Sequence, residues 1–568
     1  MPFLRRHRAL FLAVAGGVLF ALTSPPTDFY PAVLFGLALL AASLTLPPVP
    51  RGKAAVPAEL GFWSAFGRGA AWGTAAGIVG LRFVPAVIQR FTPLGVFAAY
   101  LALVLLAVAQ SLIWAIGAGI TAILRRRARV PFELAFAIGV FAAVSLPTVF
   151  AWTPAGLVSP WPVFVQLADL IGERGVSAIF ALGAALMCRA VLALRGATPE
   201  PTDSPAPPGP LRFGPSARRS ALAVVALFAA LAIHGALRIR SITASARALP
   251  TVRVGLVNHA VPPLERWDPK NSAPILRSLR ELTRKLENDG VELTIWPEAA
   301  YPYALEHDAR AVPRAGPMTI LGGRVRGPLL IGLITRDKSL ITPSGAVEHN
   351  SFNSATMITP DGVMQPPHDK LQLLWFGEMV PLGAELPWLR HLFQKSGGLI
   401  PGTEARALTL ERATGPSLRI GVLNCYEDTL ASVGRRIAVE LAPNLIVNVT
   451  NDAWFQGTAE PELHARLATM RAVELRRDLV RAVNLGVASW VDAAGTVRAR
   501  DASSEASTLE AAPTIRDAGL TLYARVGDTP LRVAFGIAAV FFALRERRAK
   551  KTEPTRSDKR ELTTRGGP

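Results

Sequence analysis

A cysteine close to an acid is the clearest chemical signal in this chain. Cys425 is one of only two cysteines among 568 residues, and it ends the apolar run 418–424, with Glu427 close behind. A free cysteine is most often a small buried hydrophobe. At the end of a strand, with an acid and an amine at the ends of other strands, it can instead be a nucleophile. Cys425 alone leaves both interpretations open.

Two other strand-like segments end in groups that could complete such a site. The run 294–297 leads into Glu298, and the run 368–369 leads into Lys370, which Glu378 follows eight residues later. Singly, each is ordinary, because an acid after a strand is usually a cap or a solvated loop residue and a loop lysine is usually surface. Together, an acid, an amine and a thiol at three strand ends favour a nucleophilic cysteine over a structural one.

The composition indicates a membrane protein with a separate polar domain. Half of the residues are apolar and the formal net charge is +19, yet only seven of the 42 acidic residues precede residue 250. The first 250 residues are therefore apolar segments interrupted by arginine, as in a protein that crosses a membrane several times. A nucleic-acid partner is disfavoured, because the basic residues stand at segment ends rather than on one face with aromatic residues between them.

Eight apolar segments predict about eight membrane-spanning helices, at 10–23, 29–46, 69–88, 94–124, 132–151, 174–194, 220–237 and 529–544. If the N-terminus is cytoplasmic, every basic cluster falls on the cytoplasmic side. We therefore expect a helix bundle over 1–244 with a proline-rich cytoplasmic linker at 196–219, an extracytoplasmic domain over 245–526, and a last helix with a basic cytoplasmic tail over 527–568. Arg82 would lie near the outer surface and could contact a lipid phosphate; the alternative is an arginine that snorkels to the interface.

Between residues 250 and 525 the pattern changes to alternating strands and helices. Strands are predicted at 251–257, 292–296, 329–334, 418–423 and 444–449, and helices at 272–288, 430–441 and 460–480. The predicted strands are apolar on both faces, which is typical of a sheet covered by helices. The fold class is therefore α/β joined to membrane α-helices.

Six segments in order resemble the nitrilase superfamily and, within it, the membrane-embedded apolipoprotein N-acyltransferase family. They are Ile295–Ala299, His368–Lys370 with Phe376–Leu382, Cys425–Glu427, Asn451–Phe455, Met470–Glu474 and Tyr523–Asp528. The resemblance implies a transmembrane bundle carrying an α-β-β-α sandwich. Val257–Ala260 and Asn484–Gly486 depart from the family pattern, which leaves the substrate detail open.

The resemblance also implies roles for individual residues. Glu298 would be the general base, Lys370 would stabilise the oxyanion and Cys425 would be the nucleophile. Glu378 and Glu427 would orient Lys370 or hydrogen-bond the base; the alternative for both is a structural ion pair. Trp267, Tyr426 and Trp454 would contact the acyl chain, although packing is the commoner role for each taken singly. No metal and no cofactor are implied.

The implied reaction moves an acyl chain from a membrane phospholipid, through a thioester on Cys425, to the α-amine of diacylglyceryl-cysteine apolipoproteins. The implied location is the bacterial inner membrane, with the catalytic domain in the periplasm. Two alternatives stay open: a membrane-anchored amidase or hydrolase that uses the same three residues with water as acceptor, and a membrane scaffold without activity.

Overall fold

The computed structural model describes residues 7–46, 60–194, 215–337, 340–341, 347–348, 350–380, 385–386, 388 and 398–552. Most of the predicted linker (196–214) and the predicted tail after residue 552 lie outside the described residues. Residues 215–219 begin a long helix instead.

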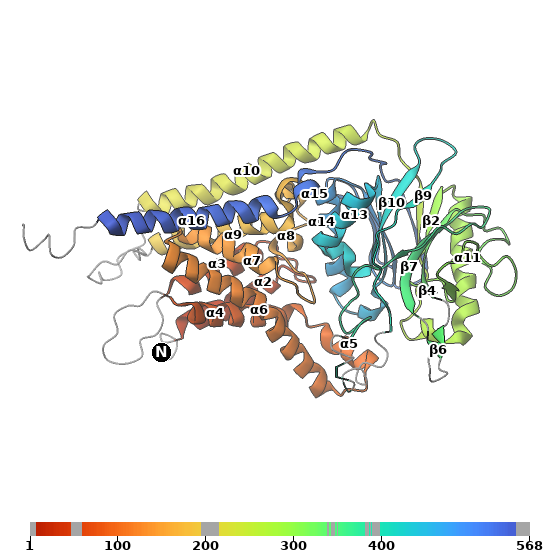
Figure 1. Cartoon of the computed structure of the whole chain (residues 1–568), viewed down its shortest axis with the longest axis horizontal. Helices are drawn as coiled ribbons and strands as arrows, with labels where there is room; N and C mark the ends of the chain where they lie inside the picture. Colours follow the sequence, from red (N-terminus) through yellow and green to blue (C-terminus); the bar gives the residue numbers. More distant parts are fainter. Residues whose placement is uncertain are drawn as a thin grey trace, which may run out of the picture.

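The described part of the chain forms a helical bundle at one end and a two-sheet domain at the other (Figure 1). The bundle contains α2 (Arg8–Ala21), α3 (Ala32–Thr45), α4 (Phe62–Gly80), α5 (Val84–Phe91), α6 (Val96–Ala128), α7 (Phe132–Val144), α8 (Pro154–Leu157), η1 (Pro162–Phe164), α9 (Ala168–Leu194), α10 (Pro215–Ala246) and α16 (Thr529–Thr552). Small residues let these helices approach closely. At the contact of α2 with α3, a Cβ on Gly16 would stand 2.8 Å from the Gly36 carbonyl oxygen.

Three of the described helices, α6, α9 and α10, are long and apolar enough to cross a membrane. A fourth span is possible if α4 and α5, which meet at a 60° bend, count as one. The apolar helices α2, α3 and α7 have only 13 or 14 residues, about 20 Å at 1.5 Å per residue against a hydrocarbon core of about 30 Å. The predicted number of eight spans is therefore not confirmed.

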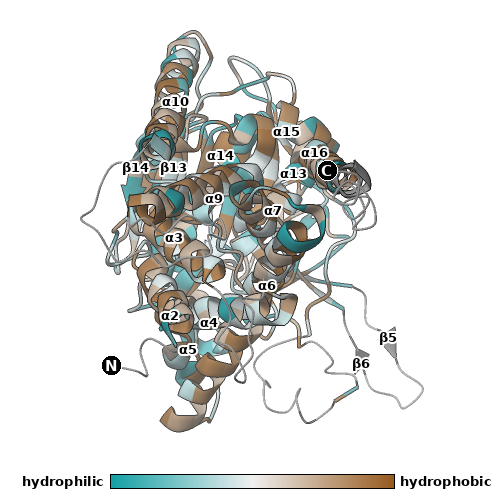
Figure 2. Ribbon diagram, turned by 90° about the vertical axis from the view of Figure 1, so that its left-hand side faces the viewer, coloured by the Kyte–Doolittle hydropathy of each residue, from teal (hydrophilic) through white to brown (hydrophobic). Residues whose placement is uncertain are grey.

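The outer surface of the bundle is apolar. Large hydrophobic side chains are exposed along α6, α10 and α16, among them Phe97, Leu105, Leu222, Ile233, Ile537 and Phe541. Figure 2 shows hydrophobic residues over much of the helical part of the molecule. Proteins in water rarely expose apolar areas of this extent, so these surfaces fit the interior of a lipid bilayer.

The second region contains a seven-stranded sheet and a six-stranded sheet. The first has the order β15 (Ser507–Ala511), β1 (Val254–Asn258), β2 (Leu293–Ile295), β4 (Leu329–Arg336), β7 (Ser351–Ile358), β8 (His368–Asp369), with β3 (Ala304–Glu306) also paired to β4. The second has the order β14 (Val497–Asp501), β13 (Ala488–Val491), β12 (Leu479–Asn484), β11 (Leu445–Asn451), β10 (Leu418–Asn424), β9 (Leu408–Leu410). A short hairpin pairs β5 (Leu340–Ile341) with β6 (Val347–Glu348).

The two sheets face each other, and helices cover their outer faces. Apolar side chains from both sheets form one core between them, for example Ile295 and Leu330 with Val422 and Val447. Helix α11 (Ser272–Asn288) packs its apolar stripe on the outside of the first sheet. Helices α13 (Ala431–Leu441) and α14 (Glu460–Leu475) pack on the outside of the second. The result is a four-layer α-β-β-α sandwich.

A buried ion cluster joins the bundle to the sandwich. Helix α9 breaks at Gly172, whose φ of 71° is left-handed, so the next amide, that of Glu173, is free to donate to Glu474 Oε1 on α14 (2.7 Å). The Arg471 guanidinium lies between the carboxylates of Glu173 and Glu474. All three side chains are almost fully buried, so α9 and α14 are joined by charge as well as by packing.

Candidate active site

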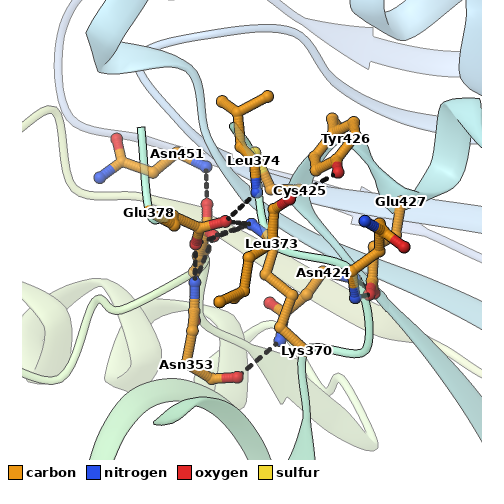
Figure 3. Close-up of polar contacts among 12 residues, drawn as sticks. Asn353, Lys370, Leu373, Leu374, Glu378, Asn424, Cys425, Tyr426, Glu427 and Asn451 are labelled. Carbon is orange, nitrogen blue, oxygen red and sulfur yellow. Dashed lines mark hydrogen bonds and ion pairs between the residues drawn. The ribbon is translucent and has the colours of Figure 1, made fainter. Parts of the chain in front are cut away.

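Glu298, Lys370 and Cys425 come from three strand ends and meet between the two sheets. Glu298 follows β2 and Lys370 follows β8, both in the first sheet, whereas Cys425 follows β10 in the second. Their exposed fractions are 6%, 1% and 9%. Figure 3 shows Lys370 and Cys425 side by side with the residues that surround them.

The Lys370 ammonium lies between two carboxylates. Its Nζ donates to Glu298 Oε1 (3.1 Å) and to Glu378 Oε1 (2.9 Å). Asn353 on β7 donates from its Nδ2 to the same two oxygens, at 2.6 Å and 2.8 Å. The backbone fixes this pair as well, because the Lys370 amide donates to the Asn353 carbonyl oxygen (2.8 Å). Charge-assisted bonds of this kind hold buried groups in one geometry.

The second oxygen of Glu298 is held from the opposite sheet. The Asn451 amide, at the end of β11, donates to Glu298 Oε2 (3.0 Å). The carboxylate of Glu298 is therefore shared between a cation of its own sheet and a backbone N–H of the sheet that carries Cys425.

Cys425 sits at a sharp turn where β10 gives way to the 3-10 helix η4 (Cys425–Thr429). Its φ of 53° lies in the left-handed region, which a non-glycine residue adopts at a cost of about 1 kcal/mol or more. Asn424 and Glu427 form a capping box across this turn, and Asn448 Nδ2 donates to the Cys425 carbonyl oxygen (2.9 Å). The strain is thus held by surrounding bonds, a pattern that is common where a nucleophile must project from a strand end.

Burial governs the protonation of the three groups. Burial raises the pKa of the Cys425 thiol well above 9.0, and the nearby Glu298 carboxylate adds to the rise while Lys370 opposes it. Burial also raises the pKa of Glu298 above 4.5, against the attraction of Lys370. For Lys370, burial lowers the pKa, but Glu298 and Glu378 more than offset this and raise the pKa well above 10.5. The resting site therefore holds a neutral thiol and a cationic lysine, and the thiol needs a base.

Glu378 and Glu427 are placed differently. Glu378 contacts the ammonium of Lys370 directly, and its other oxygen accepts from the Leu374 amide (2.9 Å). Glu427 accepts from the backbone amides of Leu371, Gln372 and Asn424 (2.7–2.8 Å). It ties the segment after Lys370 to the strand that ends at Cys425. Burial raises the pKa of Glu427 to about 7, although these amide bonds favour its carboxylate.

The predicted substrate-contacting residues are scattered around this centre. Tyr426 donates its hydroxyl to the Leu373 carbonyl oxygen (2.9 Å), and the Lys370 Nζ lies 5.7 Å from its ring centre. Trp267 is 60% exposed on the 3-10 turn η2 (Glu265–Trp267) and stacks on Arg266. Arg266 in turn donates to the carbonyl oxygen of Ala299, the residue after Glu298.

Trp454 and Arg82 lie toward the bundle. Trp454, in the 3-10 turn η5 (Asp452–Phe455), stacks on Phe91 at the end of α5, with ring centres 4.2 Å apart. Arg82 is exposed at the bend between α4 and α5 and donates to the Pro25 carbonyl oxygen (2.9 Å). The structure therefore groups Tyr426 with the three central residues and places Arg82 at the bend between two helices of the bundle.

Three contributors to this region were not predicted from the sequence. Asn353 bonds to both carboxylates, but its strand carries a polar, weakly patterned sequence and was not predicted. The Asn451 contact uses the backbone, which the side-chain pattern does not report. Arg90 on α5 donates to the carbonyl oxygens of Ala453, Trp454 and Gln456 (2.9–3.2 Å); an arginine near the end of an apolar segment gives no sign of such a partner.

One group in the described part of the chain has the residue types of a metal site. Asp452, Glu460 and His464 each offer a ligand atom within 4.8 Å of the others. Both ring nitrogens of His464 already lie 2.9 Å from carboxylate oxygens, on Asp452 and Asp428. An imidazolium that donates on both sides has no lone pair for a metal, so hydrogen bonding accounts for the cluster.

Comparison with known proteins matches both regions. Residues 253–512 match the carbon-nitrogen hydrolase family model, and residues 16–186 match the N-terminal domain model of apolipoprotein N-acyltransferase. An amidase from Nesterenkonia sp. AN1 that was solved with acrylamide added at its active-site cysteine aligns with 16% identity and a TM-score of 0.32, over 50% of this chain and 99% of its own.

Curated relatives match across the two regions together. Apolipoprotein N-acyltransferase of Bradyrhizobium diazoefficiens is 31% identical over 434 residues, which are 71% of this chain and 71% of the relative. The enzyme of the same name from Geobacter metallireducens is 28% identical over 71% of both chains, and that from Brucella melitensis is 28% identical over 87% of both. With its nitrilase-like catalytic domain on an apolar helical bundle, this chain belongs to the apolipoprotein N-acyltransferase family.

Proposed function

We propose that this enzyme transfers an acyl chain from a membrane phospholipid to the N-terminal α-amine of diacylglyceryl-cysteine apolipoproteins. The observation that supports this most directly is the buried thiol of Cys425 at a strained turn beside the Glu298–Lys370 ion pair. Family membership supplies the substrate class, since the relatives are named for apolipoprotein N-acylation.

The first half of the reaction would place the acyl group on the enzyme. The Glu298 carboxylate takes the proton of the Cys425 thiol, and the thiolate attacks the carbonyl carbon of the phospholipid ester. Lys370 and the backbone N–H after Cys425 stabilise the oxyanion that forms. The carbon–oxygen bond then breaks, Glu298 returns the proton to the departing lysophospholipid oxygen, and Cys425 carries a thioester.

The second half would pass the acyl group to the lipoprotein. The neutral α-amine attacks the thioester carbonyl, and Glu298 takes a proton from the nitrogen. The carbon–sulfur bond breaks, an amide remains, and Glu298 returns the proton to the Cys425 thiolate. Because the first product leaves before the second substrate reacts, the kinetics are ping-pong.

The charges around Glu298 suit a base that accepts a proton in one step and returns it in the next. Burial raises the pKa of Glu298, so its carboxylate is more basic than an exposed one, while the Lys370 ammonium favours its ionised form. Lys370 has three N–H donors and contacts two carboxylates, so it can turn one donor toward an oxyanion without leaving its place.

We further propose the location that this chemistry requires. Eight crossings, seven over 1–244 and one over 527–568, would place the sandwich of residues 245–526 on the periplasmic side of the bacterial inner membrane. The exposed apolar surfaces of α6, α10 and α16 support burial in a bilayer. Both substrates carry acyl chains, and pulling such a chain into water costs about 0.8 kcal/mol per methylene. A site at the membrane surface avoids this cost.

Residues around the site would then meet the lipids. Trp267 and Trp454 would contact the acyl chains, and Tyr426 would line the wall beside Lys370. Arg82 would contact a phospholipid phosphate at the membrane surface. An Arg82→Ala enzyme whose rate depends on phospholipid concentration as the wild type does would rule out that role.

The test is transfer to a model diacylated lipopeptide in phospholipid micelles, followed as a mobility shift on a gel. Wild type should produce the shift and Cys425→Ala should not, in vitro or in a strain that lacks its own acyltransferase. Release of free fatty acid without a shifted lipopeptide would instead indicate the hydrolase. No transfer, together with no labelling of Cys425 by a thiol-reactive lipid probe, would indicate the inactive scaffold.

A further inference from the structure

A buried histidine lies between two carboxylates, behind the turn that carries the nucleophile. His464 on α14 is 3% exposed, and Asp428 and Asp452 are fully buried. The His464 Nε2 lies 2.9 Å from Asp428 Oδ1, and its Nδ1 lies 2.9 Å from Asp452 Oδ1. One imidazole ring thus bridges two turns that are 24 residues apart in the chain.

Each end of this bridge is next to a reacting group. Asp428 belongs to η4, the same short turn that begins with Cys425. Asp452 directly follows Asn451, whose amide donates to Glu298 Oε2 (3.0 Å). One end of the bridge therefore holds the turn of the nucleophile, and the other holds the turn that contacts the base.

The pairing of β10 with β11 ends before these two turns, although β11 stays paired with β12 as far as Asn451 with Asn484. Strands β10 and β11 are paired in parallel, and the last pair in their register is Asn424 with Val449. Cys425 and Asp452 both lie beyond that pair. Asn448 on β11 already bonds to the Cys425 carbonyl oxygen. Since Glu298 comes from the other sheet, the distance from base to thiol depends also on how the turn after β10 is held against the turn after β11.

We propose that His464 is a positioning residue, which sets the distance between Cys425 and Glu298 by tying the turn after β10 to the turn after β11. This proposal rests on the transfer reaction proposed above. The histidine contacts no reacting atom; it acts through Asp428 on the nucleophile side and through Asp452 and Asn451 on the base side.

The charges around the His464 ring favour its doubly protonated form, which can donate to both aspartates. Burial lowers the pKa of His464, but Asp428 and Asp452 outweigh it and raise the pKa well above 6.5, against repulsion from Arg481. Arg481 Nε also donates to Asp428 Oδ2 (3.0 Å). Glu460 faces the same cluster, and burial raises its pKa to about 8, so it is mainly neutral at pH 7. Only a doubly protonated ring donates at both nitrogens, to Asp428 on one side and to Asp452 on the other.

The experiment uses the full-length enzyme in phospholipid micelles. It compares wild type, Cys425→Ala, His464→Ala, Asp452→Ala and Asp452→Asn, with Met470→Ala as the stability control. Met470 lies on the same helix and is fully buried in the core shared with the bundle. For each variant, kcat and KM for phospholipid are measured per folded molecule.

We expect His464→Ala to lower kcat about 100-fold while KM stays within about threefold, because a small misplacement of reacting groups costs rate rather than binding. Asp452→Ala should lower kcat by about as much as His464→Ala does. The double variant should be little slower than either single variant, because the two residues act through the same contact. Asp452→Asn should keep kcat within about fivefold, since its amide can still bond to the ring. Met470→Ala should lower the melting temperature and leave kcat within about twofold.

Three results would overturn the inference. They are a folded His464→Ala enzyme with kcat within threefold of wild type, an Asp452→Asn enzyme as slow as Asp452→Ala, and a fall in kcat for Met470→Ala as large as for His464→Ala. Transfer by Cys425→Ala would instead remove the proposed reaction itself, so the two failures are distinguishable.

Discussion

Two buried clusters in this protein have the same ingredients and different consequences. In the sandwich, Lys370 lies between Glu298 and Glu378; at the junction with the bundle, Arg471 lies between Glu173 and Glu474. Each is a single cation with two carboxylates, and both cations are almost fully buried. Composition and burial do not tell a reactive cluster from a structural one.

The difference lies in the cation and in what faces it. Arg471 is a planar guanidinium that stays charged, and its partners come from α9 and α14, so the cluster fastens two elements together. Lys370 is a compact ammonium with rotatable donors, and it faces a thiol on a strained turn. A cluster becomes reactive when a nucleophile and an adaptable donor share it.

Exchanging the cation at the reactive cluster should have the largest effect. Lys370→Arg keeps the charge but replaces a compact donor with a wide, rigid fork that cannot turn one N–H to the oxyanion. We expect the rate of lipopeptide acylation to fall about 10³-fold, the cost of losing one oxyanion donor. Steady-state transfer measures this, and an unchanged melting temperature shows that the fold is kept. A rate within tenfold of wild type would mean that charge alone suffices.

Removing the cation at the junction should affect stability rather than chemistry. Arg471→Met leaves Glu173 and Glu474 facing each other in a buried site, and breaking such a pair costs about 3–5 kcal/mol. Burial already raises the pKa of Glu474 to about 7, with Arg471 opposing the rise, so its protonation would relieve part of the cost. Thermal unfolding in detergent should show the loss. If Arg471→Met lowered kcat per folded molecule as much as Lys370→Arg does, the two clusters would not have separate roles.

Neutralising Glu378, the second carboxylate that contacts Lys370, should have a moderate effect on the rate. Glu378→Gln keeps an oxygen near Lys370 and the Leu374 amide but removes one charge that holds the ammonium. We expect acylation to slow about 10- to 100-fold, as for other residues that orient a reacting group. Glu404→Gln, at an exposed salt bridge with Arg406, is the matched control and should leave the rate unchanged.

The smallest expected effect is a shift in the pH profile. The base must be ionised, and burial raises the pKa of Glu298, so activity should fall on the acid side above the ordinary 4.5. The Glu378 carboxylate contributes to that rise, so in Glu378→Gln the acid limb should move to lower pH. Rates of single-turnover acylation between pH 4 and 8 give the pH profile of wild type and of Glu378→Gln. A shift to higher pH in Glu378→Gln would mean that a group other than Glu298 controls the fall in activity on the acid side.

Glu298 and Cys425 were predictable because they follow strands that the hydrophobic pattern marks, whereas Lys370 follows the two polar residues of β8 and was identified by the family resemblance. The helix predicted at 272–288 is observed as α11 with the same bounds. The helix predicted at 460–480 ends at Leu475, because Arg476 adopts a φ of 52°, and 479–484 form strand β12 instead. Long-range contacts decide that outcome: Arg476 bonds to Asp169 and Gln166 of the bundle. Local patterns carry no information about such partners.

The contact between α5 and η5 has a consequence for how the protein can vary. Arg90 reaches three carbonyl oxygens, at residues 453, 454 and 456, and a carbonyl is the same whatever side chain it carries. Substitutions at those positions leave the bonds in place, while a substitution at residue 90 removes all three at once. Evolutionary constraint thus falls on one side of the contact, so a search for paired changes between sequences would pass over it.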